Sequence, residues 1–201
     1  MNSFLANFHL HIGDWDFGFW KCNSCGIIKN IPTEFTGPFS TQYPPPRQYW
    51  EHPCKLSVWE ERFLKQAKEV SAYSKDPSTK VGCVIASPDN RFKSLGYNGF
   101  SRKNKDTPER LNNRDIKIQM VIHGELNAIL FSDGYLDDCT IFTYPFQPCA
   151  ACSSIIAQVG ITKVVAPTLS KSLEERWGKN IELAKEILDE AEIELLLVDF
   201  Q

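Results

Sequence analysis

The sequence predicts an α/β protein in which helices cover both faces of a β-sheet. From residue 57 onward, short apolar runs of strand length alternate with segments whose apolar residues recur at helical spacing. Residues 1–56 lack this alternation and are rich in Phe, Trp and Pro instead. We therefore expect two parts: an irregular N-terminal extension, residues 1–56, and an α/β domain, residues 57–201.

The elements of the α/β domain follow from apolar spacing and turn residues. Apolar residues from Trp59 to Val70 recur at near-helical spacing and predict a helix over 57–73. Two apolar runs flanking a turn at 88–91 predict a hairpin, and the polar stretch 101–120 predicts a long loop with one helical turn. The other elements are expected in this order: strands at 80–86, 92–97, 140–144, 162–166 and 195–199, and helices at 126–132, 150–159 and 172–190.

Two short stretches contain the residue types of a catalytic metal site. His123 is followed two residues later by Glu125, and Pro148 precedes Cys149 and Cys152. Cysteines three apart share one face of a helix, which Pro148 suits as a start, and His123 precedes a second expected helix. The positive end of a helix also helps both thiols to ionise. Three such ligands with an open fourth position are typical of catalytic zinc, whereas structural zinc is closed by four.

The spacing H-x-E…P-C-x-x-C is the signature of zinc-dependent nucleobase deaminases. Each motif alone has a simpler interpretation. A C-x-x-C pair can be a structural knuckle or a redox pair, a single histidine can be a core residue, and Glu125 can be an exposed carboxylate at a helix start. Both motifs in this order, with a glutamate two residues after the histidine, favour the catalytic zinc.

The N-terminal extension contains a second candidate metal site. Cys22 and Cys25 form one ligand pair and His52 and Cys54 another, as in the two knuckles of a small zinc ribbon. A segment with so little regular apolar spacing has little core of its own, so a structural zinc would explain its folding. Alternatively, these cysteines are unligated thiols and the segment packs its aromatic side chains on the main domain. Two further residues could replace a ligand: His9 and His11.

Composition and charge exclude several classes of function. The net charge of −3 and the pI of about 5.8 give no general attraction to nucleic acid or to anionic membranes. No apolar run approaches the length of a membrane span, and the first residues lack the features of a signal peptide. The seven cysteines therefore indicate metal ligands and free thiols in a reducing compartment, and we expect a cytoplasmic protein.

Five motifs make the chain from Val58 onward similar to the deoxycytidylate (dCMP) deaminases of the zinc-dependent cytidine deaminase superfamily. The metal motif alone indicates the superfamily, and the first three motifs select the dCMP branch. In family order the motifs are Ser74–Gly82 (SKDPSTKVG), Pro88–Arg91 (PDNR), Gly96–Phe100 (GYNGF), His123–Ile129 (HGELNAI) and Pro148–Cys152 (PCAAC).

The resemblance implies a three-layer α/β/α sandwich around a five-stranded mixed sheet, and a homo-oligomer, either a hexamer or a dimer. It implies hydrolytic deamination of dCMP to dUMP and ammonia, which feeds thymidylate synthesis. Zinc would be bound by His123, Cys149 and Cys152, with Glu125 as the proton carrier. Many members of the family are activated by dCTP and inhibited by dTTP at a site near the Gly-Tyr-Asn-Gly turn.

Substrate contacts are expected from Asn98, Gly124 and Tyr144. Asn98 matches a family residue that contacts the sugar, although an asparagine in a turn can also be present for its tolerance of left-handed backbone. Gly124 stands where the family usually has Ala, a difference of one methyl group beside the pyrimidine. Candidates for phosphate or effector binding, which would otherwise be solvated surface residues, are Lys80, Tyr97, Gly99, Arg102 and Arg110.

Other substrates and one other class of function remain open. The same chemistry would serve a dCTP deaminase, a cytidine or cytosine deaminase, or a tRNA adenosine deaminase. The acidic balance opposes the tRNA substrate, the family motifs oppose free bases, and the choice between monophosphate and triphosphate stays open. The other class is a non-catalytic nucleotide-binding protein with the N-terminal extension as an interaction module, but such a protein would be expected to have lost Glu125 or a zinc ligand.

Overall fold

The computed structural model describes residues 19–21, 28–30 and 56–200 of the chain. The first two ranges are the short strands β1 (Phe19–Lys21) and β2 (Ile28–Asn30), which pair antiparallel. The candidate ligands of the N-terminal zinc ribbon lie outside the described residues: Cys22, Cys25, His52, Cys54, His9 and His11.

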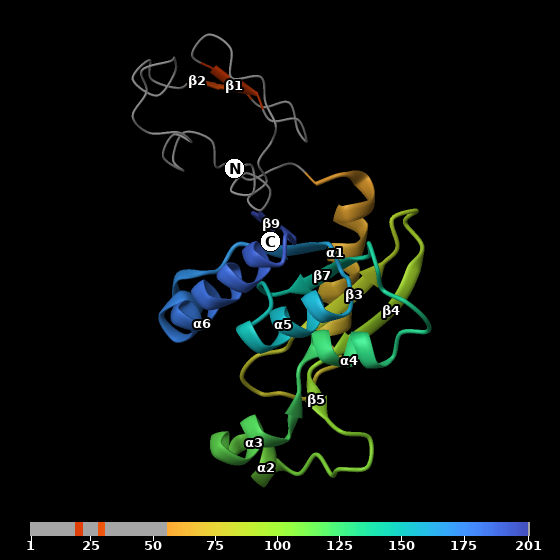
Figure 1. The fold of residues 1–201 in the computed structure, drawn as a ribbon. Coiled ribbons are helices and arrows are strands. Elements are labelled where there is room, and N and C mark those ends of the chain that lie inside the picture. Colours follow the sequence, from red (N-terminus) through yellow and green to blue (C-terminus); the bar gives the residue numbers. More distant parts are fainter. Residues whose placement is uncertain (1–18, 22–27, 31–55, 201) are drawn as a thin grey trace.

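The centre of the α/β domain is a mixed five-stranded sheet with the strand order β4-β3-β7-β8-β9 (Figure 1). The interior strand β3 pairs antiparallel with β4 and with β7, whereas β7, β8 and β9 run parallel. This arrangement confirms the predicted hairpin and the mixed sheet. The strands are β3 (Gly82–Ala86), β4 (Phe92–Tyr97), β7 (Thr140–Tyr144), β8 (Lys163–Pro167) and β9 (Glu194–Val198).

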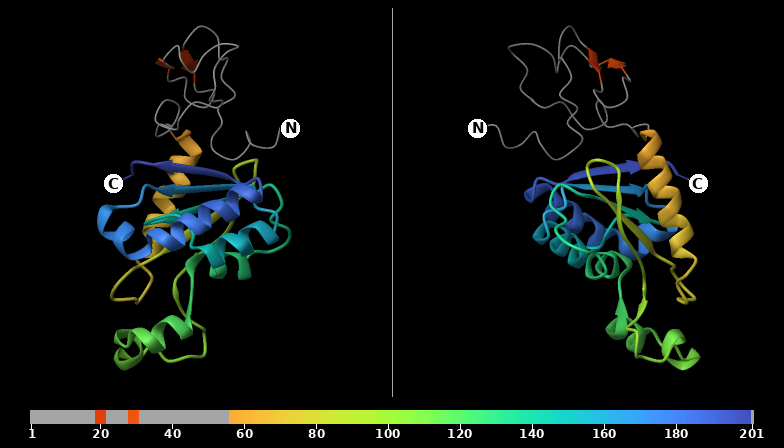
Figure 2. Two further views of the ribbon diagram at one scale, coloured as in Figure 1. Left: turned by 60° about the vertical axis from the view of Figure 1, so that its left-hand side comes forward. Right: turned by 90° about the vertical axis from the view of Figure 1, so that its right-hand side faces the viewer.

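Helices cover both faces of this sheet, which confirms the three-layer sandwich. Helix α1 (Val58–Ser71) lies on one face, and α4 (Gly124–Leu130), α5 (Ala150–Gln158) and α6 (Lys171–Glu190) lie on the other (Figures 1 and 2). Each face has its own apolar core, because alternate strand residues point in opposite directions.

Strands β3 and β7 illustrate this division. Val84 and Phe142 pack with Phe63 and Leu64 of α1, whereas Ile85 and Ile141 pack under α4, α5 and α6. All five residues of β3 are buried, as expected for a strand covered on both faces. The apolar composition of β3 therefore follows from its interior place in the sheet.

The stretch between the hairpin and His123 differs from the sequence-based expectation. It contains two helices, α2 (Pro108–Asn112) and α3 (Arg114–Met120), where we expected a loop with one helical turn. Strands β5 (Gly99–Phe100) and β6 (Val121–Ile122) pair antiparallel and connect these helices to the sheet domain (Figure 2).

Local capping explains the two unexpected helices. The Thr107 side chain accepts a hydrogen bond from the backbone of Arg110, with Pro108 at the first helical position, and the Asn113 side chain caps α3. These capping residues can be recognised in the sequence, but the many charged residues of the segment 101–120 leave too little apolar periodicity to predict the two helices.

In the described part of the chain, no helix is both long enough and apolar enough to cross a lipid bilayer.

Helix α1 packs so closely on β3 that one glycine is required between them. A Cβ atom at Gly82 would overlap the carbonyl oxygen of Ala67 and the backbone nitrogen of Ser71. We expect Gly82→Ala to lower the free energy of unfolding by about 1–3 kcal/mol, because the backbone of α1 would have to move. Gly178→Ala is the control: its Cβ meets only Glu174 at 3.9 Å in helix α6, and it should raise stability by about 0.5–1 kcal/mol. If chemical denaturation gave the same change in the free energy of unfolding for Gly82→Ala and Gly178→Ala, the close packing of α1 on Gly82 would be contradicted.

Candidate metal centre and substrate pocket

Two helix starts bring three metal-ligating side chains together. His123 is the N-cap residue of α4, Cys149 is the N-cap residue of α5, and Cys152 lies in the first turn of α5. The Nδ1 atom of His123 lies 3.4 Å from the Sγ atom of Cys149 and 3.4 Å from that of Cys152. The ligand atoms of all three residues lie within 4.8 Å of one another.

These distances fit a tetrahedral zinc ion. Bonds of about 2.0 Å to nitrogen and about 2.3 Å to sulfur, at the tetrahedral angle, separate nitrogen from sulfur by about 3.5 Å. The observed separations are 3.4 Å. Among the described residues, these three form the group that could hold a metal ion, and no fourth described side chain belongs to it.

The ionisation of the cysteines also fits a divalent cation. A hydrogen bond from Cys152, together with one from His123, lowers the pKa of Cys149, although burial acts in the opposite direction. The pKa of Cys152 is raised, because its thiol proton bonds to Cys149 and because the side chain is buried. A bound cation would allow both sulfurs to be thiolates.

Helix α6 contributes to the position of the cysteine helix. Neither His123 nor Cys149 caps its own helix with a side-chain hydrogen bond, so both side chains are free to face the ion. The side-chain oxygen of Asn180 accepts a hydrogen bond of 3.0 Å from the backbone N–H of Ala150, at the first position of α5. Asn180 therefore satisfies one of the donors that a capping residue would otherwise satisfy.

Glu125 lies beside the metal ligands without belonging to the ligand set. Its side chain is only 4% exposed, in the first turn of α4. Burial raises the pKa of Glu125, although its own backbone N–H and the charge of His123 act in the opposite direction. A buried carboxyl group in this place is suited to accept a proton and give it up again.

A pocket of about 400 Å³ opens over His123, Glu125 and Cys149. Its walls come from the loop before β3, from α3 and from α6. The other residues that line it are Asp76, Ser78, Thr79, Val81, Asn98, Arg114, Lys117, Ile118, Val121, Phe146, Ala151, Arg176, Trp177 and Asn180.

Asn98 lines this pocket, as expected for a substrate contact, and it also fixes the pocket wall. Its side-chain oxygen accepts a hydrogen bond of 2.7 Å from the backbone N–H of Val81, and its nitrogen donates one of 2.9 Å to the carbonyl of Thr79. Asn98 is not among the residues with positive φ. The alternative explanation, tolerance of left-handed backbone, is therefore wrong.

Two expected substrate contacts lie elsewhere. The ring of Tyr144 packs edge-on against Phe200 on the α1 side of the sheet, because it shares the strand face of Phe142. Phe146, two residues later, lines the pocket instead. The methyl group that Gly124 lacks would contact Cys83 and Val81 at 3.2 Å, so it would meet the buried side of α4. Neither Tyr144 nor Gly124 lines the pocket.

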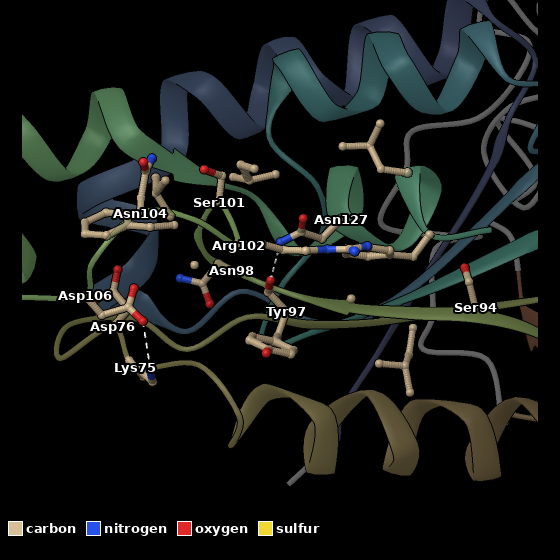
Figure 3. Close-up of a pocket in the computed structure, with 18 of the residues that line it drawn as sticks. Lys75, Asp76, Ser94, Tyr97, Asn98, Ser101, Arg102, Asn104, Asp106 and Asn127 are labelled. Atoms are coloured by element: carbon tan, nitrogen blue, oxygen red, sulfur yellow. Dashed lines mark hydrogen bonds and ion pairs between the residues drawn. The ribbon is translucent and has the colours of Figure 1, made fainter.

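The expected phosphate or effector residues are divided between two places. Tyr97, Gly99 and Arg102 line a second groove of about 1020 Å³ along β4 and α4 (Figure 3). Lys80 and Arg110 line neither this groove nor the pocket over the metal ligands.

Three cations that were not expected from the sequence line the metal-site pocket: Arg114, Lys117 and Arg176. The first two are three residues apart on α3, a helix that was not predicted, so their shared direction was not visible. Arg176 lies in a predicted helix, but amphipathic spacing does not show which polar residues of a helix meet a pocket.

A family model described as the cytidine and deoxycytidylate deaminase zinc-binding region matches residues 57–168. This range contains His123, Glu125, Cys149 and Cys152. The ion for which the three ligands are arranged is therefore zinc.

Relatives and solved structures agree with this match. The uncharacterized deaminase in the luxG 3′ region of Aliivibrio fischeri is 38% identical over 140 residues, which are 70% of this chain and 93% of the relative. A probable deoxycytidylate deaminase of Caenorhabditis elegans is 38% identical over 142 residues, 66% of either chain. The crystal structure of dCMP deaminase from the cyanophage S-TIM5 with dCMP and dUMP has a TM-score of 0.56 at 21% identity, over 72% of this chain and all of that one, and it shows the same fold.

Loss of one ligand should remove one zinc ion per chain. We expect Cys152→Ala to lower the zinc content of the full-length protein by one equivalent, because two protein ligands hold the ion far less tightly than three. Cys139→Ala is the matched control, since Cys139 is buried in the apolar core outside the ligand set. Elemental analysis after gel filtration measures both. An unchanged zinc content in Cys152→Ala would contradict the site.

Proposed function

Since the chain belongs to the cytidine and deoxycytidylate deaminase family, we propose that it hydrolyses dCMP to dUMP and ammonia. The observation that carries this proposal is the buried Glu125 beside an open three-ligand zinc site, inside a pocket of about 400 Å³. The choice of dCMP is supported by relatives named deoxycytidylate deaminase, including those of mouse and human, at 34–35% identity.

The chemistry divides between the ion and the chain. When bound, zinc supplies a Lewis acid that lowers the pKa of a water molecule at its open position to near neutrality. Glu125 would take a proton from the attacking water and pass it to N3 as the water oxygen bonds to C4 of the cytosine ring. It would then carry the second proton from the new hydroxyl group at C4 to the amine, so that the C4–N bond breaks, the C4 carbonyl forms and ammonia leaves.

The remaining residues shape the pocket. Asn98 holds the backbone of Thr79 and Val81 at one wall, and Trp177 packs against Phe146 at another, with ring centroids 6.3 Å apart. Lys117 forms an ion pair of 2.9 Å with Asp76 and fixes α3 to the domain. These contacts keep the pocket formed before the substrate arrives, which lowers the cost of orientation.

Glu125→Gln should separate catalysis from metal binding. The variant keeps the size of the side chain and removes the proton acceptor, so we expect full zinc content and an unchanged fold with a loss of kcat of roughly 10²–10⁴-fold. Glu182→Gln, an exposed carboxylate of α6, is the control and should match the wild type. Ammonia release from dCMP, dCTP, CMP and cytidine measures both. Normal turnover by the zinc-loaded Glu125→Gln protein would refute the role of Glu125 in proton transfer. If the wild-type protein acted selectively on dCTP or cytidine, dCMP would be the wrong substrate.

We further propose that the groove along β4 and α4 binds a nucleotide effector such as dCTP or dTTP. Tyr97 and Arg102 line it, the guanidinium of Arg102 lies 4.5 Å over the ring of Phe131, and Lys75 pairs with Asp106 at one end (Figure 3). Cations beside aromatic rings suit a triphosphate and a base. Arg102→Gln should raise the dCTP concentration needed for half-maximal effect, and a wild type unaffected by dCTP and dTTP would exclude the proposal.

We propose a homo-oligomer and a cytoplasmic location as well. Phe92 of edge strand β4 (47%), Leu130 at the end of α4 (63%) and Phe131 after it (48%) are exposed. Exposed apolar side chains gathered at one edge suit an interface between copies. These three also line the groove proposed for the effector, so the effector would bind at this interface. The thiolate ligands require a reducing compartment. Analytical ultracentrifugation tests the assembly, and a monomer at micromolar concentration would contradict it.

For residues 1–56, we propose a separate structural zinc module held by Cys22, Cys25, His52 and Cys54. Its support is the ligand spacing, together with the antiparallel pairing of β1 and β2, which precede and follow the Cys22–Cys25 segment in the sequence. Two zinc ions per wild-type chain, of which a Cys22→Ser/Cys25→Ser variant loses one, would support it. A single zinc that Cys152→Ala removes would contradict it.

A further inference from the structure

Two arginines at the catalytic pocket have no partner among the described residues. Arg114 on α3 and Arg176 on α6 both line the pocket that contains His123 and Glu125, and both are exposed. Neither forms an ion pair or a hydrogen bond with any residue that the structure describes. Two guanidinium groups from separate helices therefore border the same cavity with their donors available.

The charges around the pocket leave these arginines uncompensated. Two carboxylates line it, Asp76 and Glu125. Asp76 accepts hydrogen bonds from Lys117 and from the backbone N–H groups of Ser78 and Thr79. Although burial opposes its ionisation, these bonds keep the pKa of Asp76 below its usual value. Glu125 is buried beside the zinc ligands, so neither carboxylate forms an ion pair with Arg114 or Arg176.

On the α3 side, a buried contact fixes the direction of Arg114. Lys117 is only 9% exposed, and its Nζ atom lies 2.9 Å from Asp76 and 3.2 Å from the hydroxyl of Ser78. Arg114, Lys117, Ile118 and Val121 all line the pocket. The spacing of Arg114, Lys117 and Ile118 places these three on one side of α3, and Val121 follows the helix in β6. Because Lys117 holds that side toward the domain, Arg114 faces the pocket.

On the α6 side, neighbours of Arg176 on the same helix contact residues next to the metal ligands. Asn180, one turn later, bonds to the backbone N–H of Ala150, the residue after Cys149. Trp177 packs against Phe146. Arg176, Trp177 and Asn180 line the pocket together. The position of Arg176 relative to the metal centre is therefore set by packed and hydrogen-bonded neighbours.

We propose that Arg114 and Arg176 form the subsite that binds the 5′-phosphate of the substrate, an inference that rests on the proposed deamination of dCMP. A guanidinium group presents paired donors that match phosphate oxygens. The subsite selects nucleotides over nucleosides. Of the cations expected from sequence for this role, Lys80 and Arg110 line neither cavity, and Arg102 lies over Phe131 in the other groove.

The test compares a phosphorylated substrate with its nucleoside. Arg114→Gln and Arg176→Gln should each lower kcat/KM for dCMP about tenfold or more, chiefly through KM, because a hydrogen bond to a charged group is lost. Turnover of deoxycytidine should stay within about twofold of the wild type, since it lacks the phosphate. Arg176→Lys should retain part of the activity on dCMP. The control is Lys179→Gln, an exposed cation of α6 that does not line the pocket.

Equal losses on dCMP and deoxycytidine, or no loss on dCMP, would overturn the assignment. Where the wild type turns over deoxycytidine too slowly to measure, inhibition by dUMP should weaken in both variants, while inhibition by deoxyuridine should not. Zinc content and thermal unfolding of each variant confirm that it is folded. A wild type that does not deaminate dCMP would refute the proposed function itself, which is a different result from equal losses in the two variants.

Discussion

The structure depends on the meeting of two helix starts at one metal ion. An N-cap position normally holds Ser, Thr, Asp or Asn, whose side chain satisfies the first backbone N–H groups of the helix. Here His123 and Cys149 occupy the N-caps of α4 and α5, and neither caps its own helix. Their side chains face each other instead, and the positive ends of both helices favour the thiolate ligands. Asn180 of α6 supplies part of the missing cap at α5.

The strands of the sheet lead into these helix starts, and the segment of α2 and α3, residues 108–120, forms part of the pocket wall around them. Strand β7 leads into the turn before α5, and β6, which pairs with β5, leads from α3 into α4. Buried polar contacts hold this segment and the neighbouring loop in place. Lys117 of α3 pairs with Asp76, and the Asn98 side chain bonds to the backbone of Thr79 and Val81. Asp76, Asn98 and Lys117 line both the catalytic pocket and the second groove, so this polar wall separates the two cavities.

The features that could be predicted from the sequence are those that depend on residues a few positions apart. The H-x-E and C-x-x-C spacings placed the ligands and Glu125, because helix geometry fixes the direction of residues a few positions apart. The strands followed from apolar runs and the five-stranded mixed sheet from the family resemblance, but the strand order was not predicted, since apolar spacing does not specify which strands pair. Tyr144 was misplaced because its direction depends on strand alternation set by long-range packing. Arg114 and Arg176 were missed because only the folded chain brings α3 and α6 to one cavity.

The most direct test of this account is an anomalous difference map, recorded at the zinc absorption edge from crystals of the full-length protein. We predict a peak about 2.0 Å from Nδ1 of His123 and about 2.3 Å from the sulfurs of Cys149 and Cys152, with no fourth protein ligand. A zinc ion closed by a fourth side chain would contradict an open catalytic site. The absence of a peak at these three residues would contradict the metal centre on which the proposed chemistry rests.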